Sequence, residues 1–294
     1  MSALVARGTP IAVIAPSHAY DPAKLEAGLA IARARGHDLR PFEGMRAPHR
    51  YFAAPEELRR AHLIEALDDP RYGAVWLVRG GSGLLQVLDG KIPWNRLRTK
   101  PVIGFSDAVA LHLALEKHGL GPSIHGPMLH SLPTTDEAST EHLFRLLAGE
   151  PVEPISGEAW VGGLAAGPLY GGNLCTLAAA CGTQWQPQAR GRILVLEDIG
   201  EVPYRVDRLL QQLKSSGVFE GVAGIVVGEF LGPEAPAGAE WDVRDVLMDH
   251  LRRLAVPVVG GIPIGHGARN HAFVWGAPAV LRNGVLSGPA VGSR

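Results

Sequence analysis

Residues 101–111 read Pro-Val-Ile-Gly-Phe-Ser-Asp-Ala-Val-Ala-Leu. The stretch opens with a short apolar run typical of a β-strand, turns at Gly104, and continues with apolar residues four apart, a spacing that predicts a helix. Lys117 and Gly119 suit the last turn and the C-cap of that helix. Ser106 therefore stands at a corner between a strand and a helix. A serine there either caps the helix or exposes a nucleophilic hydroxyl at the edge of a sheet.

The chain before this corner alternates between strand and helix patterns. Apolar runs predict strands at 11–15, 38–42 and 74–78. Asp21 with Pro22 opens a helix that ends before Gly36, and Pro55 opens another. Such alternation predicts an α/β fold with a parallel, doubly wound sheet, whose functional loops lie at the carboxyl ends of the strands.

A local change in amino-acid composition indicates two domains. Residues 151–172 are rich in glycine and proline and poor in charge, so we expect a crossover linker between a first domain at 1–150 and a second at 173–294. A helix around 141–147 ends the first domain. In the second we expect helices at 173–180, around 206–213 and from about 241, strands at 193–196 and 224–228, and a loop at 232–236.

Composition excludes several classes of protein. The 294 residues are 46% hydrophobic and 19% charged, with a formal net charge of −1 and scattered basic residues, so no nucleic-acid or anionic-membrane surface is expected. The apolar run at 11–15 is too short for a signal peptide, and no segment has the length of a membrane span. We therefore expect a cytoplasmic protein.

Neither cysteines nor histidines suggest a metal. Cys175 and Cys181 are six apart, which fits no common zinc spacing, and we expect free thiols. The twelve histidines are dispersed without a His-Glu-x-x-His pattern, so no metal is expected.

The glycine loop, Arg79 to Gly83 (Arg-Gly-Gly-Ser-Gly), follows the third predicted strand. It lacks both the Lys-Ser/Thr of a P-loop and the spacing of a dinucleotide fingerprint, so a tight turn and a nucleotide site both remain open. A third interpretation is half of an oxyanion hole, in which the backbone N–H groups of Gly81 and Asp107 donate to the reaction centre.

A base and an acid come later in the chain. His266 has glycines on both sides, which allow a sharp bend and an accessible imidazole. Glu197 follows the apolar run 193–196 and could orient a histidine, although Asp198 and Glu201 compete for that role on sequence alone. His62, His112, His118 and His142 lie on predicted helices and are expected to be structural.

Several blocks, taken in order, give the chain a family resemblance. It resembles the LD-carboxypeptidases of the serine peptidase type, which include murein tetrapeptide carboxypeptidases and microcin C self-immunity peptidases. The blocks span nearly the whole chain: Val13–Ser17, Arg79–Gly83, Gly104–Asp107, His125–Met128, Gly171–Leu174, Leu196–Glu201 with Pro203–Arg208, and Gly265–Gly267 with Asn270.

The resemblance implies a nucleophile at Ser106, an acid at Glu197 and a base at His266. It also implies a flavodoxin-like N-terminal half that bears the serine, a smaller C-terminal α/β half that bears the other two, a site between them, and a homodimer. One residue departs from the family pattern: Ser82 stands where an aromatic tyrosine is common, which puts substrate packing against the glycine loop in question.

These features together predict a serine LD-carboxypeptidase that releases a terminal D-amino acid, D-alanine, from murein tetrapeptides in peptidoglycan recycling, without metal or organic cofactor. Arg79, Arg205 and Arg269 are candidates to bind the terminal carboxylate of the substrate. The alternatives are an amidase for a microcin C-type peptidyl-nucleotide antibiotic and a non-catalytic small-molecule binding protein.

Overall fold

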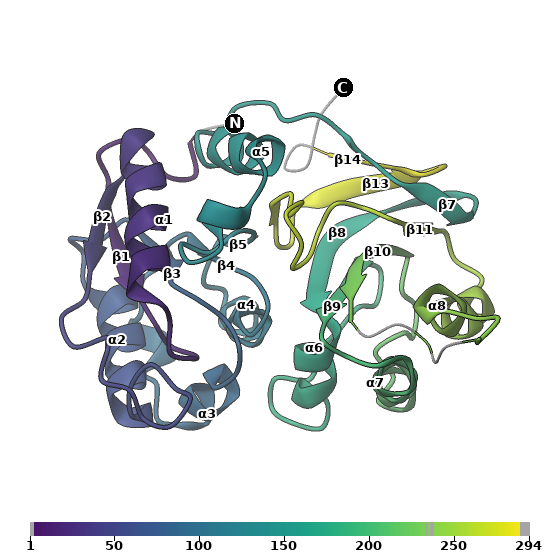
Figure 1. Cartoon of the computed structure of the whole chain (residues 1–294), viewed down its shortest axis with the longest axis horizontal. Coiled ribbons are helices and arrows are strands. Elements are labelled where there is room, and N and C mark those ends of the chain that lie inside the picture. Colours follow the sequence, from purple (N-terminus) through teal and green to yellow (C-terminus); the bar gives the residue numbers. More distant parts are fainter. Residues whose placement is uncertain (1–2, 233–234, 236–237, 289–294) are drawn as a thin grey trace. The chain divides into compact units, whose positions relative to one another are not determined.

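The computed structural model describes residues 3–232, 235 and 238–288. The chain divides into two compact units, Met1–Glu150 and Pro151–Arg294, each with its own sheet (Figure 1). The loop expected at 232–236 includes Pro233, Glu234 and Pro236, which lie outside the described residues.

The first unit alternates strands and helices as the sequence predicts. In chain order its elements are β1 (Pro10–Ile14), α1 (Pro22–Ala34), β2 (Asp38–Pro41), α2 (Glu56–Asp68), β3 (Ala74–Leu77), α3 (Leu84–Asp89), β4 (Val102–Gly104), α4 (Ala108–Lys117), β5 (Ser123–His125) and α5 (Glu137–Leu147), with short 3-10 turns at Trp94–Arg96 and Leu132–Thr134. The order β5-β4-β3-β1-β2, with every pair parallel, is that of a doubly wound sheet.

Local chemistry explains the start of α1. Asp21 accepts a hydrogen bond from the N–H of Ala23 at 2.9 Å, and Pro22 occupies the first turn, where no backbone N–H is needed. Two short elements, α3 and β5, were not predicted, because six and three residues are too few to show a hydrophobic period.

The strand order places α1 and α2 on opposite faces of the sheet. The crossover through α1 runs from β1 to β2, the crossover through α2 runs back in the opposite direction from β2 to β3, and both are expected to be right-handed. On one face α2 contacts α3 and α3 contacts α4. On the other, Arg35 at the end of α1 lies over the ring of Phe144 on α5, 4.8 Å from its centroid. Because β3 pairs with β4, the glycine loop after β3 and Ser106 after β4 emerge side by side.

The second unit mixes parallel and antiparallel strands. Its elements are β6 (Ile155–Ser156), β7 (Glu158–Val161), β8 (Leu164–Asn173), α6 (Leu174–Ala180), β9 (Ile193–Ile199), α7 (Pro203–Ser215), β10 (Gly224–Leu231), α8 (Val243–Leu251), a 3-10 turn (Arg252–Leu254), β11 (Val258–Gly260), β12 (Phe273–Val274), β13 (Pro278–Arg282) and β14 (Val285–Ser287). Its large sheet has the order β6-β14-β13-β8-β9-β10-β11-β7, with β8 to β11 parallel.

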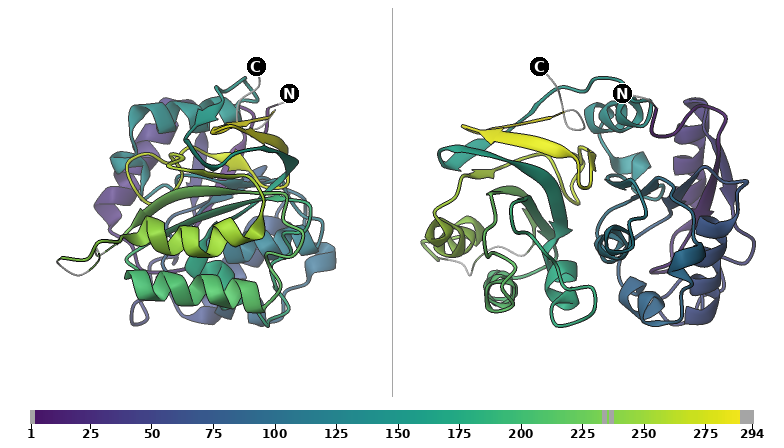
Figure 2. Two further views of the ribbon diagram at one scale, coloured as in Figure 1. Left: turned by 90° about the vertical axis from the view of Figure 1, so that its right-hand side faces the viewer. Right: turned by 180° about the vertical axis from the view of Figure 1, so that it is seen from behind.

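Three helices cover one face of this sheet. Figures 1 and 2 show α6, α7 and α8 side by side, in agreement with the contacts of α7 with both neighbours. The core contains fully buried residues from the parallel strands, among them Ile193, Val195 and Val226.

Residues 151–172 differ from the expected linker. They form β6, β7 and most of β8, and they belong to the second unit. The expected strands at 193–196 and 224–228 are also longer, since β9 continues to Ile199 and β10 to Leu231. Glu197 therefore lies within a strand rather than after it.

Candidate active site

Ser106 occupies a strained corner. Its φ is +64°, in the left-handed region, which costs a non-glycine residue about 1–2 kcal/mol. Helix α4 begins at Ala108 with Asp107 as its N-cap residue and without a side-chain cap, so the helix-cap interpretation of Ser106 is wrong. A strained serine between a sheet strand and a helix is the geometry of a nucleophile elbow.

The glycine loop lies directly against this corner. A Cβ on Gly80 would come within 3.0 Å of Ser106 Oγ and 3.3 Å of the Asp107 nitrogen, so only glycine fits without displacing the serine. Gly81 has φ +110°, and a Cβ there would overlap the ring of His18. Among the described residues of this unit, no acceptor pairs with the backbone N–H of Gly81 or of Asp107. Both donors are thus available next to the serine.

The Asp107 side chain joins three segments. Its buried carboxylate accepts hydrogen bonds from Ser17 Oγ at 2.6 Å and from the N–H of Leu84 at 3.0 Å. Burial raises the pKa of this carboxyl, while the two hydrogen bonds and the charge of Arg59 act in the opposite direction. The segment after β1, the start of α3 and the serine corner are therefore tied together.

Arg59 supports the same region and was missed by sequence reasoning. It is 1% exposed and donates to the carbonyls of Pro16 at 2.7 Å and Gly83 at 3.1 Å. A signal was present in the sequence, because Arg59, Leu63 and Leu67 are spaced four apart and share the buried face of α2.

Glu197 and His266 form a close pair in the second unit. The carboxylate of Glu197, fully buried on β9, lies 2.6 Å from His266 Nδ1. Because an ionised carboxylate only accepts hydrogen bonds, Nδ1 carries the proton and Nε2 is left as the basic nitrogen. Burial alone would lower the pKa of His266, but the charge and hydrogen bond of Glu197, helped by Asp198, raise it above the usual value.

The competing acids have other partners. Asp198 accepts hydrogen bonds from Asn173 Nδ2 at 3.0 Å and from the N–H of Cys175 at 2.9 Å, and burial raises its pKa to about 6. Glu201 lies 3.6 Å from Arg205. Alternation along β9 explains the difference between Glu197 and Asp198, since neighbouring side chains on a strand point to opposite faces of the sheet, whereas Glu201 lies beyond the end of β9.

Glu229, a second residue missed by sequence reasoning, shapes the histidine loop, Gly265 to Gly267. Its carboxylate accepts from the N–H of Gly267 at 3.1 Å, and its own N–H donates to the carbonyl of Ile264 at 2.8 Å. A Cβ on Gly267 would overlap the Glu229 carboxylate, which explains why glycine follows His266.

The three candidate arginines differ in their surroundings. Arg79 is half-buried and donates to the carbonyl of Ala19 at 2.7 Å. Arg205 is exposed beside Glu201, and Arg269 donates twice to Glu229, at 3.1 and 3.3 Å.

The remaining polar candidates play structural parts. Neither Cys175 nor Cys181 forms a disulfide, and burial raises the pKa of Cys181. The fully buried His112 contacts the carbonyl of Gly104 through Nε2 at 2.9 Å, and the ring of His118 stacks on Trp94. The described residues contain no cluster of three or more His, Cys, Asp or Glu suited to a metal ion. Nor do they include a helix long and apolar enough to cross a bilayer.

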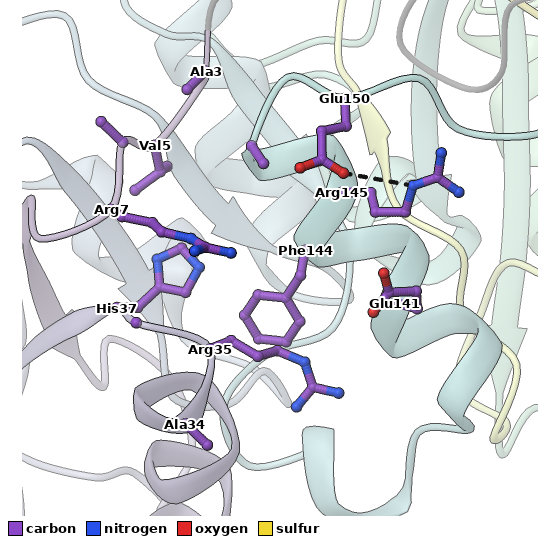
Figure 3. A pocket seen from close by; sticks show the side chains of 13 residues that line it. Ala3, Val5, Arg7, Ala34, Arg35, His37, Glu141, Phe144, Arg145 and Glu150 are labelled. Atoms are coloured by element: carbon purple, nitrogen blue, oxygen red, sulfur yellow. Dashed lines mark ion pairs between the residues drawn. The ribbon is translucent and has the colours of Figure 1, made fainter.

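A separate cavity of about 660 Å³ lies at the opposite end of the first sheet, before β1 and β2 (Figure 3). Arg7, His37 and Phe144 line it. Two more lining arginines face acids, Arg35 with Glu137 at 3.1 Å and Arg145 with Glu150 at 3.8 Å. The cavity takes no part in the site around Ser106.

Comparisons with known proteins agree with these observations. The LD-carboxypeptidase N-terminal domain model matches residues 11–126, and the C-terminal domain model matches residues 166–281. A putative carboxypeptidase of Synechocystis is 37% identical over 93% of this chain and 91% of its own length. A murein tetrapeptide carboxypeptidase of Pseudomonas aeruginosa is 36% identical over 94% of both chains.

Solved structures show the same fold. The muramoyltetrapeptide carboxypeptidase of Oxalobacter formigenes superposes with a TM-score of 0.83 at 30% identity, covering 95% of this chain and 97% of its own. The structure of MccF in complex with glutamyl sulfamoyl guanosine superposes with a TM-score of 0.86 at 21% identity and covers 100% of this chain and 99% of its own. At this identity the similarity concerns the fold alone. The chain belongs to the LD-carboxypeptidase family and is a serine-type carboxypeptidase.

Proposed function

We propose that this enzyme releases the terminal D-alanine of murein tetrapeptides, with Ser106 as nucleophile, His266 as general base and Glu197 as the residue that orients His266. The observation that carries the proposal is Ser106 itself, held at φ +64° beside two backbone N–H donors. The Pseudomonas aeruginosa relative, named for murein tetrapeptides, supports the substrate class.

In the first half of the proposed reaction, Ser106 Oγ attacks the carbonyl carbon that precedes the terminal D-residue, and its proton passes to His266 Nε2. The carbonyl oxygen becomes an oxyanion that the N–H groups of Gly81 and Asp107 stabilise, each by roughly 3–4 kcal/mol. The C–N bond then breaks, and His266 returns the proton to the departing amine of D-alanine.

Water completes the cycle. His266 takes a proton from a water molecule, whose oxygen attacks the acyl-serine ester. The ester C–O bond breaks, His266 returns the proton to Ser106 Oγ, and the shortened peptide leaves with a free carboxylate. Glu197 holds the required tautomer and stabilises the imidazolium in both halves. A place in peptidoglycan recycling is consistent with this substrate, and we further propose a homodimer located in the cytoplasm, which light scattering and cell fractionation would test.

Ser106→Ala is the direct test. The wild type, incubated with a murein tetrapeptide, should release D-alanine, which a D-amino-acid oxidase assay measures. The variant should release it at a rate lower by at least about 10³-fold. Ser215→Ala, an exposed serine at the end of α7, is the control. Undiminished release by Ser106→Ala would refute the proposed nucleophile. Cleavage of an aminoacyl sulfamoyl nucleoside in place of the tetrapeptide would instead favour the antibiotic amidase.

A crystal structure with a covalent serine inhibitor gives an independent check. We expect His266 Nε2 within hydrogen-bond distance of Ser106 Oγ in that complex. A different nucleophile joined to the inhibitor would rule out the assignment.

A further inference from the structure

An enzyme that removes a terminal residue has to recognise a free carboxylate. Taking an unpaired carboxylate out of water is costly, so a cation near the nucleophile that lacks a carboxylate partner of its own would favour binding of the substrate terminus. This inference rests on the function proposed above and asks which arginine supplies that cation.

Two of the three candidate arginines already have acidic partners. Arg205 faces Glu201 at 3.6 Å, and its side chain is 57% exposed on α7. Arg269 donates twice to Glu229, the carboxylate that also binds the histidine loop. A second carboxylate would have to compete with Glu201 or Glu229 for either guanidinium.

Arg79 has no such competitor. One N–H of its guanidinium donates to the carbonyl of Ala19 at 2.7 Å, and no carboxylate in the described part of the first unit pairs with it. Two histidines are influenced by its charge: burial, and then the charge of Arg79, lowers the pKa of His18 and of His130. The charge of Asp21 raises the pKa of His130, but the Asp21 side chain already serves as the N-cap of α1.

Arg79 is next in sequence to the glycine that contacts the proposed nucleophile. It directly precedes Gly80, where a Cβ would lie 3.0 Å from Ser106 Oγ, and the carbonyl of Gly80 accepts from the N–H of His18 at 3.3 Å. The terminal carboxylate lies one residue beyond the scissile carbonyl, about 4 Å away. The Arg79 guanidinium, held by the carbonyl of Ala19 at 2.7 Å, belongs to the first residue of the glycine loop, which contacts the serine.

We propose that Arg79 binds the terminal carboxylate of the substrate and so restricts the enzyme to peptides with a free C-terminus. The planar guanidinium suits a two-point hydrogen bond to a carboxylate, which a lysine ammonium cannot reproduce. Arg79 is then a specificity-determining residue on the same unit as the nucleophile.

The test compares two substrates and three variants. The substrates are a murein tetrapeptide that ends in D-alanine and the same peptide that ends in D-alaninamide. We expect Arg79→Ala to lower kcat/KM for the acid by about 100-fold and for the amide by less than about threefold. Arg79→Lys should have a kcat/KM for the acid between those of the wild type and Arg79→Ala. Arg205→Ala should match the kcat/KM of the wild type within about twofold on both substrates.

Binding is measured separately from turnover. In the Ser106→Ala background, calorimetry with the intact tetrapeptide should show the affinity fall on adding Arg79→Ala, while the melting temperature stays within a few degrees. Equal losses on acid and amide, unchanged binding, or acid selectivity that depends on Arg205 would overturn the assignment. Failure of the wild type to release D-alanine, or activity in Ser106→Ala, would instead overturn the proposed function, and the basis for Arg79 with it.

Discussion

Two histidines with opposite pKa shifts carry the pH dependence at the scale of single residues. His266 has its pKa raised by Glu197, whereas burial lowers the pKa of His112 to about 4. The first titration belongs to the proposed reaction and the second to the stability of the fold. The two are therefore separable by experiment.

Glu197→Gln tests the titration of His266. A general base acts as the neutral imidazole, so the rate of the wild type should rise as pH rises through the raised pKa of His266. The amide of the variant removes the charge that raises the pKa of His266, while the burial that lowers this pKa remains. The acid limb of kcat/KM should therefore move to lower pH. We expect kcat to fall by roughly 10³–10⁴-fold, measured as D-alanine release across pH. An acid limb that does not move would remove Glu197 from the proposed mechanism.

His112→Gln tests the effect of His112 titration on stability. A buried histidine whose folded pKa is about 4 stays neutral, while the unfolded chain takes up a proton below pH 6.5. The wild type should thus lose about 2 kcal/mol of unfolding free energy from this group between pH 7 and pH 5, and the variant should not. Urea denaturation at both pH values measures the difference, and equal losses in the two proteins would contradict the prediction.

At the scale of elements, each candidate residue is held by backbone that a neighbouring carboxylate organises. Asp107 ties the end of β1 and the start of α3 to the serine corner through Ser17 and Leu84. Glu229 on β10 does the same for the histidine loop. These carboxylates act as positioning residues, because they set the geometry of groups that carry the proposed chemistry.

Glu229→Gln probes this positioning role. The amide keeps the size of the side chain but weakens its hydrogen bonds to Gly267 and Arg269, which frees the loop around His266. We expect kcat to fall by roughly 10- to 100-fold with little change in KM and no shift of the acid limb. Arg269→Ala is the matched control, since an exposed ion pair contributes about 0–1 kcal/mol. A larger effect in the control than in Glu229→Gln would show that the ion pair, and not the loop contact, matters.

The whole molecule consists of two units that each bury a sheet of their own. Fully buried residues of β1 and β3 form the centre of the first, and those of β9 and β10 the centre of the second. The proposed function therefore draws on two separately packed cores, one that carries Ser106 and one that carries Glu197 and His266.

Hydrogen exchange followed by mass spectrometry should show these two cores. We expect the slowest amides in β1, β3, β9 and β10, and much faster exchange in the edge strands β2, β6 and β7, because central strands open only in global or unit-wide unfolding. A single protected core confined to one unit would contradict this prediction.

Much of the fold was predictable from the sequence, because its signals are local. Most elements were identified to within a few residues by local features: the cap at Asp21, the apolar strand runs, and helical spacing such as that of Val206, Leu210 and Leu213. The residues 151–172 were harder to interpret, because glycines and prolines of the kind that suggest a linker also occur within β8, an interior strand of the second sheet that pairs with β13.

The candidate residues follow from local sequence: Ser106 from its place between a strand and a helix, His266 from its flanking glycines, and Glu197 from its place at the end of an apolar run. The folded chain was needed to show that Glu197, and neither Asp198 nor Glu201, meets His266 Nδ1. It was also needed to show that Ser106 adopts a positive φ and that Arg59 and Glu229 support the two loops. The difference lies in the distance along the chain over which each signal acts. Caps and periodic patterns depend on neighbours a few residues apart, whereas the bond between Glu197 and His266 joins residues 69 positions apart, which only the packing of β9 and β10 brings together.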